Sequence, residues 1–262
     1  MTVESRPLDP DLLAILRDVG KERIRDLATQ VDRTQEFSRE LWELLSEQGL
    51  PTMPYVDEDA GHDGSFRAYV EGIEEVASHG ACAALYSGPT VQVATAIDRF
   101  GTPEQKERWG QGLISGGLLG AWSFTVPQTG SDPQQIQTWA RRDGDEWVIT
   151  GSKMFTSFAP HADVALVFAK TSERRLGAFL VDTTDPGWQP GPPVKMLAFG
   201  GLGPRPGIDR RARAGERPAG RRGRRLRHHG RHRVRGEGAC ERDHDRHRPS
   251  RARRGRELRA RT

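Results

Sequence analysis

AWSFTVPQTGSD at residues 121–132 and TGSKMFTSFA at residues 150–159 are the two stretches that decide the fold of this chain. Each places an aromatic residue beside hydroxyl side chains, within a segment whose other residues are typical of a β-strand. The Gly-containing turn of the first stretch offers backbone N–H groups and two hydroxyls, a combination that suits a phosphate. Taken alone, the first stretch also fits an ordinary turn, and Phe155 also fits a core position. The surrounding sequence therefore has to be considered with them.

Short segments rich in β-branched and aromatic residues surround these two stretches. Turn-forming residues (Gly, Asp-Gly or Pro) separate these short segments from one another, and this pattern is typical of β-strands. Arg142-Asp143-Gly144-Asp145 has the composition of a tight hairpin turn. We therefore expect an antiparallel, β-barrel-like domain over residues 118–203. Its strands are predicted at residues 119–126, 136–142, 146–150, 164–170 and 176–183.

Upstream of these strands, residues 10–115 have helical periodicity. One helix is predicted over 34–48, with Phe37, Leu41, Leu44 and Leu45 on one face and Gly49 at its end. Ser65 is the expected N-cap of another helix. Thr102-Pro103-Glu104-Gln105 combines an N-cap, a proline at the first helical position and a capping glutamine. The fold class is therefore α+β, with an all-α domain at residues 1–117 before the β domain.

The last segment, residues 204–262, has a different composition. It contains 22 arginines but no lysine, Phe, Tyr or Trp, and its net charge is about +15, against about −11 for residues 1–203. Its few apolar side chains cannot offset roughly 1–2 kcal/mol of backbone entropy per ordered residue. We expect residues after about 204 to be disordered.

The two opening stretches resemble the start of the β domain of the acyl-CoA dehydrogenase family. That family has aromatic-x-x-Thr-Glu-Pro-x-Ala-Gly-Ser-Asp, which Trp122–Asp132 matches, and Asn-Gly-x-Lys-x-Trp-Ile-Thr-Asn, which Thr150–Phe158 matches. FGTPEQKERW at 100–109 and AFLVDTTDPGWQ at 178–189 also match, so the resemblance spans residues 10–203. Val126, Thr129 and Phe155 stand where the family has Glu, Ala and Trp, which points to a divergent substrate.

The resemblance implies an FAD site, with FAD as the cofactor. Backbone groups near Phe124 and Thr125 would face the polar edge of the flavin, and Ser131 would lie near the diphosphate and the thioester substrate. Phe155 would pack on the flavin ring, with a hydroxyl near its N5 atom, where charge develops during hydride transfer. The expected cofactor-binding residues are Trp122, Phe124, Thr125, Gly130, Ser131, Phe155, Thr156 and Ser157.

The implied activity is α,β-dehydrogenation of an acyl thioester. A coenzyme A thioester is the first choice of substrate and an acyl carrier protein thioester the alternative, with an electron-transfer flavoprotein or oxygen as acceptor and a homo-oligomer as the intact enzyme. No residue of this chain matches the family's glutamate base, which belongs to a C-terminal helical bundle. We expect a cytoplasmic protein, because the sequence has only two cysteines and no signal sequence. We expect no membrane span, because the sequence has no long apolar run.

The arginine-rich segment begins where the family enters its bundle, and we interpret it as the product of a reading-frame shift between Gly200 and Arg210. Codons that encode residues 210–220 as written can be chosen so that a one-base shift reads Asp-Ala-Arg-Val-Pro-Ala-Ser-Asp-Leu-Leu. The chain as written is then expected to be inactive and to bind FAD weakly or not at all. The alternatives are a noncatalytic scaffold and a basic-tailed nucleic-acid-binding protein; we do not expect the second, because the tail has no interleaved aromatic residues.

Overall fold

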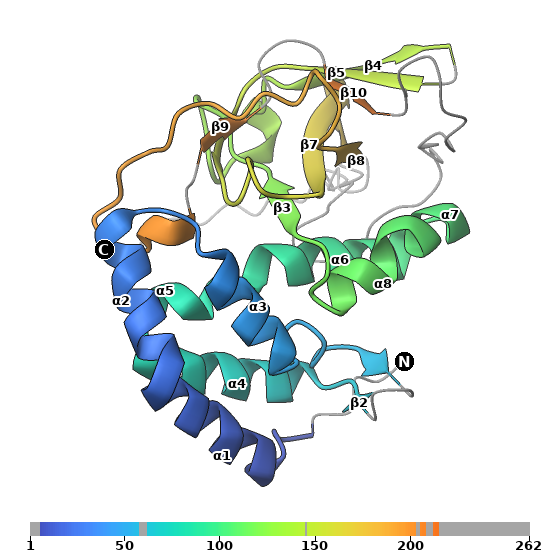
Figure 1. Cartoon of the computed structure of the whole chain (residues 1–262). Helices are drawn as coiled ribbons and strands as arrows, with labels where there is room; N and C mark the ends of the chain where they lie inside the picture. Colours follow the sequence, from blue (N-terminus) through green and yellow to red (C-terminus); the bar gives the residue numbers. More distant parts are fainter. Residues whose placement is uncertain (1–5, 58–61, 145, 203–204, 208–211, 215–262) are drawn as a thin grey trace, which may run out of the picture.

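The computed structural model describes residues 6–57, 62–144, 146–202, 205–207 and 212–214. Helices form one half of the molecule and a sheet forms the other (Figure 1). The fold class predicted from the sequence is confirmed. Except for residues 205–207 and 212–214, the tail predicted to be disordered lies outside the described residues.

The helical half is built from eight α-helices and two π-helical segments among the described residues. Two of these helices begin at the predicted caps. The Ser65 side chain accepts a hydrogen bond from Ala68 N at the start of α4, and Thr102 and Gln105 form the complete capping box at α7. The elements are α1 (Pro10–Val19), η1 (Gly20–Ile24), α2 (Arg25–Thr34), α3 (Arg39–Glu47), α4 (Phe66–His79), α5 (Ala81–Ala84), α6 (Gly88–Phe100), α7 (Pro103–Gln105), η2 (Lys106–Gly110) and α8 (Gln111–Ile114).

The π-helical segment η1 joins α1 to α2 without a break in the helix. Gly20, its first residue, lies against the ring of His79 at the end of α4, where a Cβ atom would overlap the ring. The His79 Nε2 and Glu75 Oε1 atoms are 3.2 Å apart, and Glu75 also pairs with Arg17 at 3.0 Å. Glycine thus lets the first helix approach α4 closely enough for these contacts.

The second half is a six-stranded sheet with one short strand pair. The strand order in the sheet is β10-β5-β4-β7-β3. The remaining strand, β8, is not on this path and also pairs with β7. The short pair is β6 with β9, and another pair, β1 with β2, lies in the helical half between α3 and α4. The strands are β1 (Val56–Asp57), β2 (His62–Asp63), β3 (Gly120–Ser123), β4 (Trp139–Asp143), β5 (Glu146–Thr150), β6 (Lys153–Thr156), β7 (Val164–Ser172), β8 (Arg175–Asp182), β9 (Arg205–Gly207) and β10 (Ala212–Ala214).

The pairing is less uniform than the antiparallel, barrel-like sheet expected from the sequence. β3 and β4 both pair with β7 in parallel, while β4–β5, β7–β8 and β5–β10 are antiparallel. The strand path does not close into a barrel over the part of the chain that the structure describes. The predicted hairpin is present, since Asp143 pairs with Glu146 and Gly144 has a φ of 61°.

The tail contributes two short strands to this half. β9 pairs antiparallel with β6, and β10 pairs antiparallel with β5. These two segments were expected to be disordered with the rest of residues 204–262, and instead they extend the β structure.

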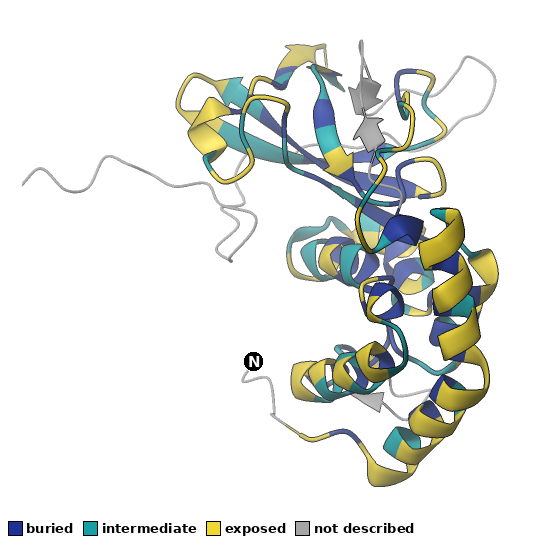
Figure 2. Ribbon diagram, turned by 90° about the vertical axis from the view of Figure 1, so that its left-hand side faces the viewer, coloured by how far each residue is buried: buried dark blue, intermediate teal, exposed yellow. Residues whose placement is uncertain are grey.

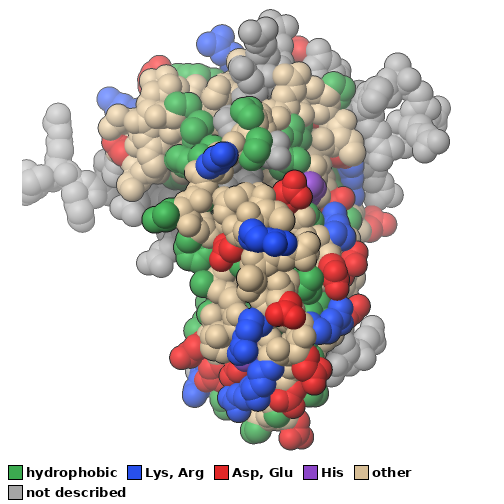
Figure 3. Space-filling view, turned by 60° about the vertical axis from the view of Figure 1, so that its left-hand side comes forward, with side chains coloured by type: hydrophobic (Ala, Val, Ile, Leu, Met, Phe, Trp, Pro, Cys, Tyr) green, Lys and Arg blue, Asp and Glu red, His purple; other side chains and the backbone are tan. Residues whose placement is uncertain are grey.

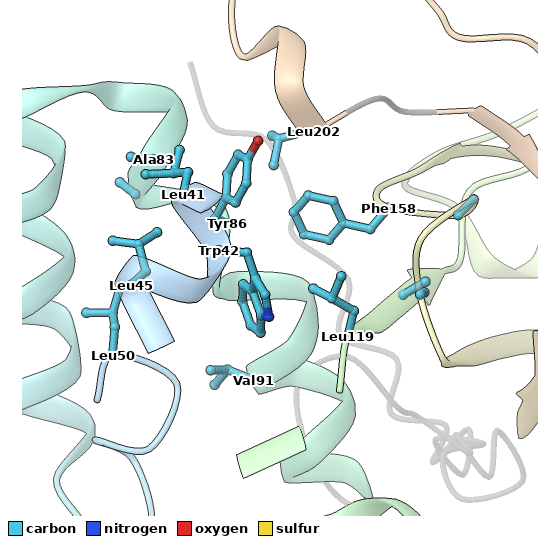
Figure 4. Close-up of a cluster of buried hydrophobic side chains, with 14 of the residues drawn as sticks. Leu41, Trp42, Leu45, Leu50, Ala83, Tyr86, Val91, Leu119, Phe158 and Leu202 are labelled. Carbon is cyan, nitrogen blue, oxygen red and sulfur yellow. The ribbon is translucent and has the colours of Figure 1, made fainter. Parts of the chain in front are cut away.

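Two clusters of buried hydrophobic residues each contain side chains from both halves, and Figure 4 shows part of the larger one (see also Figure 2). Trp42 of α3 is 1 % exposed and donates from Nε1 to the Gly116 carbonyl at 2.9 Å. Phe158, which follows β6, packs edge-on against Tyr86 and Phe37. The segment after β6 is thereby held against the helices. No helix among the described residues has the length and apolarity needed to cross a membrane.

Candidate functional site

The stretches at residues 121–132 and 150–159 lie side by side, at β3 with its following loop and at β6. Three hydrogen bonds join them. The Ser123 and Thr156 hydroxyls share one at 3.0 Å, Met154 N donates to the Thr125 carbonyl at 2.8 Å, and Lys153 Nζ donates to the Phe124 carbonyl at 2.9 Å. We call residues 122–131 and 153–157 the paired segments. Three successive residues of the first segment, Ser123, Phe124 and Thr125, are thus each hydrogen-bonded to the second segment.

A tight turn follows the first paired segment. Val126 and Thr129 exchange two backbone hydrogen bonds, at 3.1 and 3.2 Å. The Thr129 hydroxyl accepts from Asp132 N at 3.3 Å, and Asp132 caps a 3₁₀ turn, η3 (Pro133–Gln135). The side-chain hydrogen bond from Gln135, followed by the backbone N–H of Gln134, holds the pKa of Asp132 below its usual value.

These contacts explain two of the residues that depart from the family pattern. Val126 is only 2 % exposed, so an apolar side chain suits the position. Thr129 serves the turn through its backbone and its hydroxyl. Gly130 and Ser131 lie exposed just beyond, on the outside of the turn.

Phe155 is the most unusual residue of the site. Its backbone has a φ of 58°, which bulky residues seldom adopt, and its ring is 55 % exposed. Phe158, three residues later, also has positive φ, at 59°, but is 1 % exposed. The chain therefore turns so that one ring enters the core and the other faces outward. An exposed aromatic ring held by strained backbone is available to stack on a flat ligand.

The remaining predicted residues separate into inward and outward groups. Trp122 and Phe124 are half-buried and pack on Phe168 of β7, with ring centroids 4.9 and 5.1 Å away. Thr156 is fully buried, and its hydroxyl is engaged by Ser123, so it joins the segments. Ser157 is half-buried, and its hydroxyl has no hydrogen-bond partner among the described residues.

Lys153 is the residue of the site that sequence reasoning missed. Its side chain is 0 % exposed, and burial lowers its pKa to about 7. Among the described residues its ammonium has one hydrogen-bond acceptor, the Phe124 carbonyl. Strand alternation would place Lys153 on the same face as Phe155, which is exposed, so no local pattern in the sequence indicated that Lys153 points inward. The positive φ of Phe155 breaks this alternation.

A cavity of about 620 Å³ lies between the helices and the β domain. Its walls include Phe37, Phe158, His161 and Lys195, and none of the predicted flavin-site residues lines it. Figure 3 shows side chains of both charges gathered over the helical half and hydrophobic side chains gathered on the β half. The paired segments belong to the β half.

Comparisons with known proteins find matches to both halves of the chain. Residues 11–117 match the model for the acyl-CoA dehydrogenase N-terminal domain, and residues 121–203 match the model for the acyl-CoA dehydrogenase middle domain. A curated relative is the 3-(aryl)acrylate reductase of Clostridium sporogenes, 33 % identical over 190 residues, which cover 71 % of this chain and 50 % of that protein. The chain spans about half the length of the curated relatives it matches.

Solved structures show the same likeness. Butyryl-CoA dehydrogenase from Megasphaera elsdenii superposes with a TM-score of 0.73 at 26 % identity, over 80 % of this chain and 58 % of that one. A glutaryl-CoA dehydrogenase from Mycobacterium smegmatis, in complex with FADH2, gives 0.72 at 26 % identity, over 79 % and 54 %.

Proposed function

This chain belongs to the acyl-CoA dehydrogenase family, and from that premise we propose that its paired segments hold FAD for the α,β-dehydrogenation of an acyl thioester. The observation that carries the proposal is the set of groups that these segments leave available. The Thr125 N–H has no acceptor and the Ser157 hydroxyl no partner among the described residues, and the Phe155 ring is exposed. Two hydrogen-bonding groups beside an open aromatic face suit a flat heteroaromatic ring.

Each available group has a role in holding the cofactor. Phe155 would stack on the isoalloxazine, and the Ser157 hydroxyl would hydrogen-bond near its N5 atom. The Thr125 N–H would donate to the polar edge of the ring system, and Gly130 and Ser131 on the exposed turn would hold the diphosphate. When bound, FAD supplies the acceptor for the β-hydrogen, which leaves the substrate as hydride.

Apolar side chains support the turn from within. Val126 is buried and Trp122 is half-buried, and at the first of these positions the family has a glutamate. Preorganised donors are more effective in a dry site, because the electrostatic interactions there are screened less. We therefore expect the thioester carbonyl to approach the site near Ser131, at the open side of the turn.

The substrate and partners are proposed at the level of chemical class. The names of the relatives point to CoA thioesters and to CH–CH redox chemistry. We propose a coenzyme A thioester as substrate, with an acyl carrier protein thioester as the alternative, and an electron-transfer flavoprotein or oxygen as acceptor. The intact enzyme is proposed to be a cytoplasmic homo-oligomer. The base that removes the α-proton is assigned to no residue of this chain.

We further propose that the frame changes between Gly200 and Arg210 and that the chain as written is inactive. Its resemblance to the family stops at residue 203, in the same region where its composition changes to arginine. Without the bundle, apolar faces that the family covers would remain open to water, which weakens FAD binding.

The test compares two proteins, the chain as written and the product of the gene with its frame restored by one base. Both are purified, their flavin absorbance is measured, and reduction of a dye acceptor by an acyl-CoA is followed. We expect the restored protein to be stoichiometrically yellow and active, and the written chain to be colourless and inactive. A colourless restored protein would refute the FAD site, whereas an active written chain would refute the frame proposal alone.

A further inference from the structure

Lys153 occupies a place where an apolar side chain would pack at lower cost. It is among the largest fully buried side chains of the molecule, and its single hydrogen-bond partner among the described residues is a neutral carbonyl. Burying a charge without a charged partner is unfavourable, and replacing buried charges with apolar residues is often neutral or stabilising. The cost of burying Lys153 is therefore expected to be offset by what its hydrogen bond does to the Phe124 carbonyl.

The contact is to one particular peptide unit. The Phe124 carbonyl, which accepts from Lys153 Nζ at 2.9 Å, belongs to the same peptide plane as the Thr125 N–H. The described residues contain no cis peptide bond, so in this plane the carbonyl and the N–H point in opposite directions. A hydrogen bond to the carbonyl therefore fixes the direction of the N–H on the far side.

The same hydrogen bond also changes the strength of the donor. Hydrogen bonds in a chain polarise one another, and a charged donor polarises its acceptor more than a neutral one does. An ammonium on the Phe124 oxygen withdraws electron density from the peptide unit and makes the Thr125 N–H a better donor. The Thr125 carbonyl is held separately by Met154 N at 2.8 Å, so the peptide units on both sides of Thr125 are fixed.

We propose that Lys153 is a positioning residue of the flavin site, which orients and polarises the Phe124–Thr125 peptide so that the Thr125 N–H is a strengthened donor to the polar edge of the flavin. This inference rests on the proposed function for its ligand. Its effect on the Thr125 N–H is a property of the chain alone and can be measured without FAD.

The surroundings of Lys153 allow its charge to change near neutral pH. Burial is the cause that lowers its pKa, to about 7, and no charged neighbour among the described residues adds to this. The strand β3 and residues 124–125, which face it, carry no titratable side chain. On β9, Gly207 pairs with Lys153 and Arg205 pairs with Thr156, so Arg205 is the charged residue of the neighbouring strand. Loss of the proton leaves an amine, which still donates but polarises the peptide less.

The first experiment follows the Thr125 amide resonance of the isotope-labelled 262-residue chain by NMR as pH is raised from 5.5 to 9. We expect it to move with a single midpoint near pH 7, as Lys153 titrates. In Lys153→Met the movement should be lost. In Lys106→Met, a control that removes an exposed lysine 4.0 Å from Asp98, it should remain. A wild-type resonance that does not titrate, or one that titrates equally in Lys153→Met, would overturn the inference.

The second experiment measures FAD affinity by fluorescence titration of the frame-restored protein. Lys153→Met should weaken FAD binding about tenfold at pH 6, because the donor loses its polarising charge, which is worth ~1.4 kcal/mol. The wild-type affinity should fall between pH 6 and 8.5, whereas that of Lys153→Met should not. Equal affinities and equal pH profiles would contradict the inference.

The two experiments separate this inference from the function on which it rests. If the wild-type protein binds no FAD but its Thr125 amide titrates with Lys153, the proposed cofactor is wrong and the coupling within the chain is right. If FAD binds and the Thr125 amide does not respond to Lys153, FAD is the correct cofactor and the inference about Lys153 is wrong.

Discussion

Ser123 of β3 and Thr156 of β6 are both fully buried, and their hydroxyl oxygens are 3.0 Å apart. Each hydroxyl is the side-chain hydrogen-bond partner of the other, so removing either one leaves a buried polar group without its bond. We expect Ser123→Ala and Thr156→Val each to lower the free energy of unfolding by about 1–3 kcal/mol. Urea unfolding followed by tryptophan fluorescence measures both.

The double variant provides the control for this pair. When both partners are replaced by apolar groups of similar shape, no orphaned hydroxyl remains. Ser123→Ala/Thr156→Val should therefore lose about 1 kcal/mol less than the sum of the single losses. Strict additivity would mean that the two hydroxyls do not interact in solution.

The pH dependence of stability reports on Lys153. Its folded pKa is about 7 against 10.5 for the free side chain, so between these values the unfolded chain binds more protons than the folded one. Stability then rises with pH across this window, and the cost of the buried charge is fully present below about pH 7. We expect a gain of about 2–3 kcal/mol between pH 7 and 9, from roughly 1.4 kcal/mol per pKa unit.

The comparison for this prediction is Lys153→Met, measured by urea unfolding at the same pH values. Without the amine this part of the pH dependence should vanish, and stability at pH 6 should equal or exceed that of the wild type. Curves that run parallel for the two proteins would show that Lys153 keeps an ordinary pKa in the folded chain.

Gly20 tests the close approach of η1 to α4. A Cβ atom there would overlap the His79 ring, so we expect Gly20→Ala to cost about 1–3 kcal/mol. At Gly88, which begins α6, an added Cβ would have no atom within 4 Å, and Gly88→Ala should be neutral or slightly stabilising. Thermal unfolding by circular dichroism distinguishes the two. Equal melting temperatures would mean that His79 moves away freely.

Phe155 and Phe158 provide a matched pair of aromatic truncations. Phe158 is 1 % exposed and lies in the core between the halves, so Phe158→Ala should cost about 3–5 kcal/mol. Phe155 is 55 % exposed, and Phe155→Ala should change stability by less than about 0.5 kcal/mol.

The affinity of the frame-restored protein for FAD should show a different pattern for Phe155. Loss of its ring removes a stacking contact worth about 0.5–1.5 kcal/mol, so FAD should bind up to about tenfold more weakly. Flavin fluorescence quenching measures this affinity. An unchanged dissociation constant in Phe155→Ala would remove this residue from the proposed site.

Local signals in the sequence predicted much of the fold, because they act over a few residues. The Ser65 cap, the capping box of Thr102 and Gln105, and the hairpin at Gly144 are all confirmed. The parallel pairing of β3 with β7 was not predicted, since it joins Gly120 to Val164 and depends on contacts distant in sequence. The family match is confirmed for residues 11–117 and 121–203, while the assignment of individual flavin contacts remains a prediction.

The site shows the same division between local and distant information. Residue type marked Thr156 as a hydroxyl beside an aromatic, but only the fold shows that it is buried against Ser123. Lys153 stands inside the second motif, yet lysine is normally a surface residue, and its burial depends on the packing of two strands. Sequence reasoning located the segments and could not assign an inward or outward direction to each side chain.

The pairing of β10 with β5 bears on the proposed change of frame. Strand pairing joins main-chain N–H and C=O groups, which every amino acid except proline supplies in full. In the proposed frame, positions 212–214 would read Arg-Val-Pro, and the proline would stand opposite Trp147, at the end of the paired stretch. The main-chain groups of positions 212 and 213 would then be kept, so we expect either product to be able to pair with β5 at these two positions.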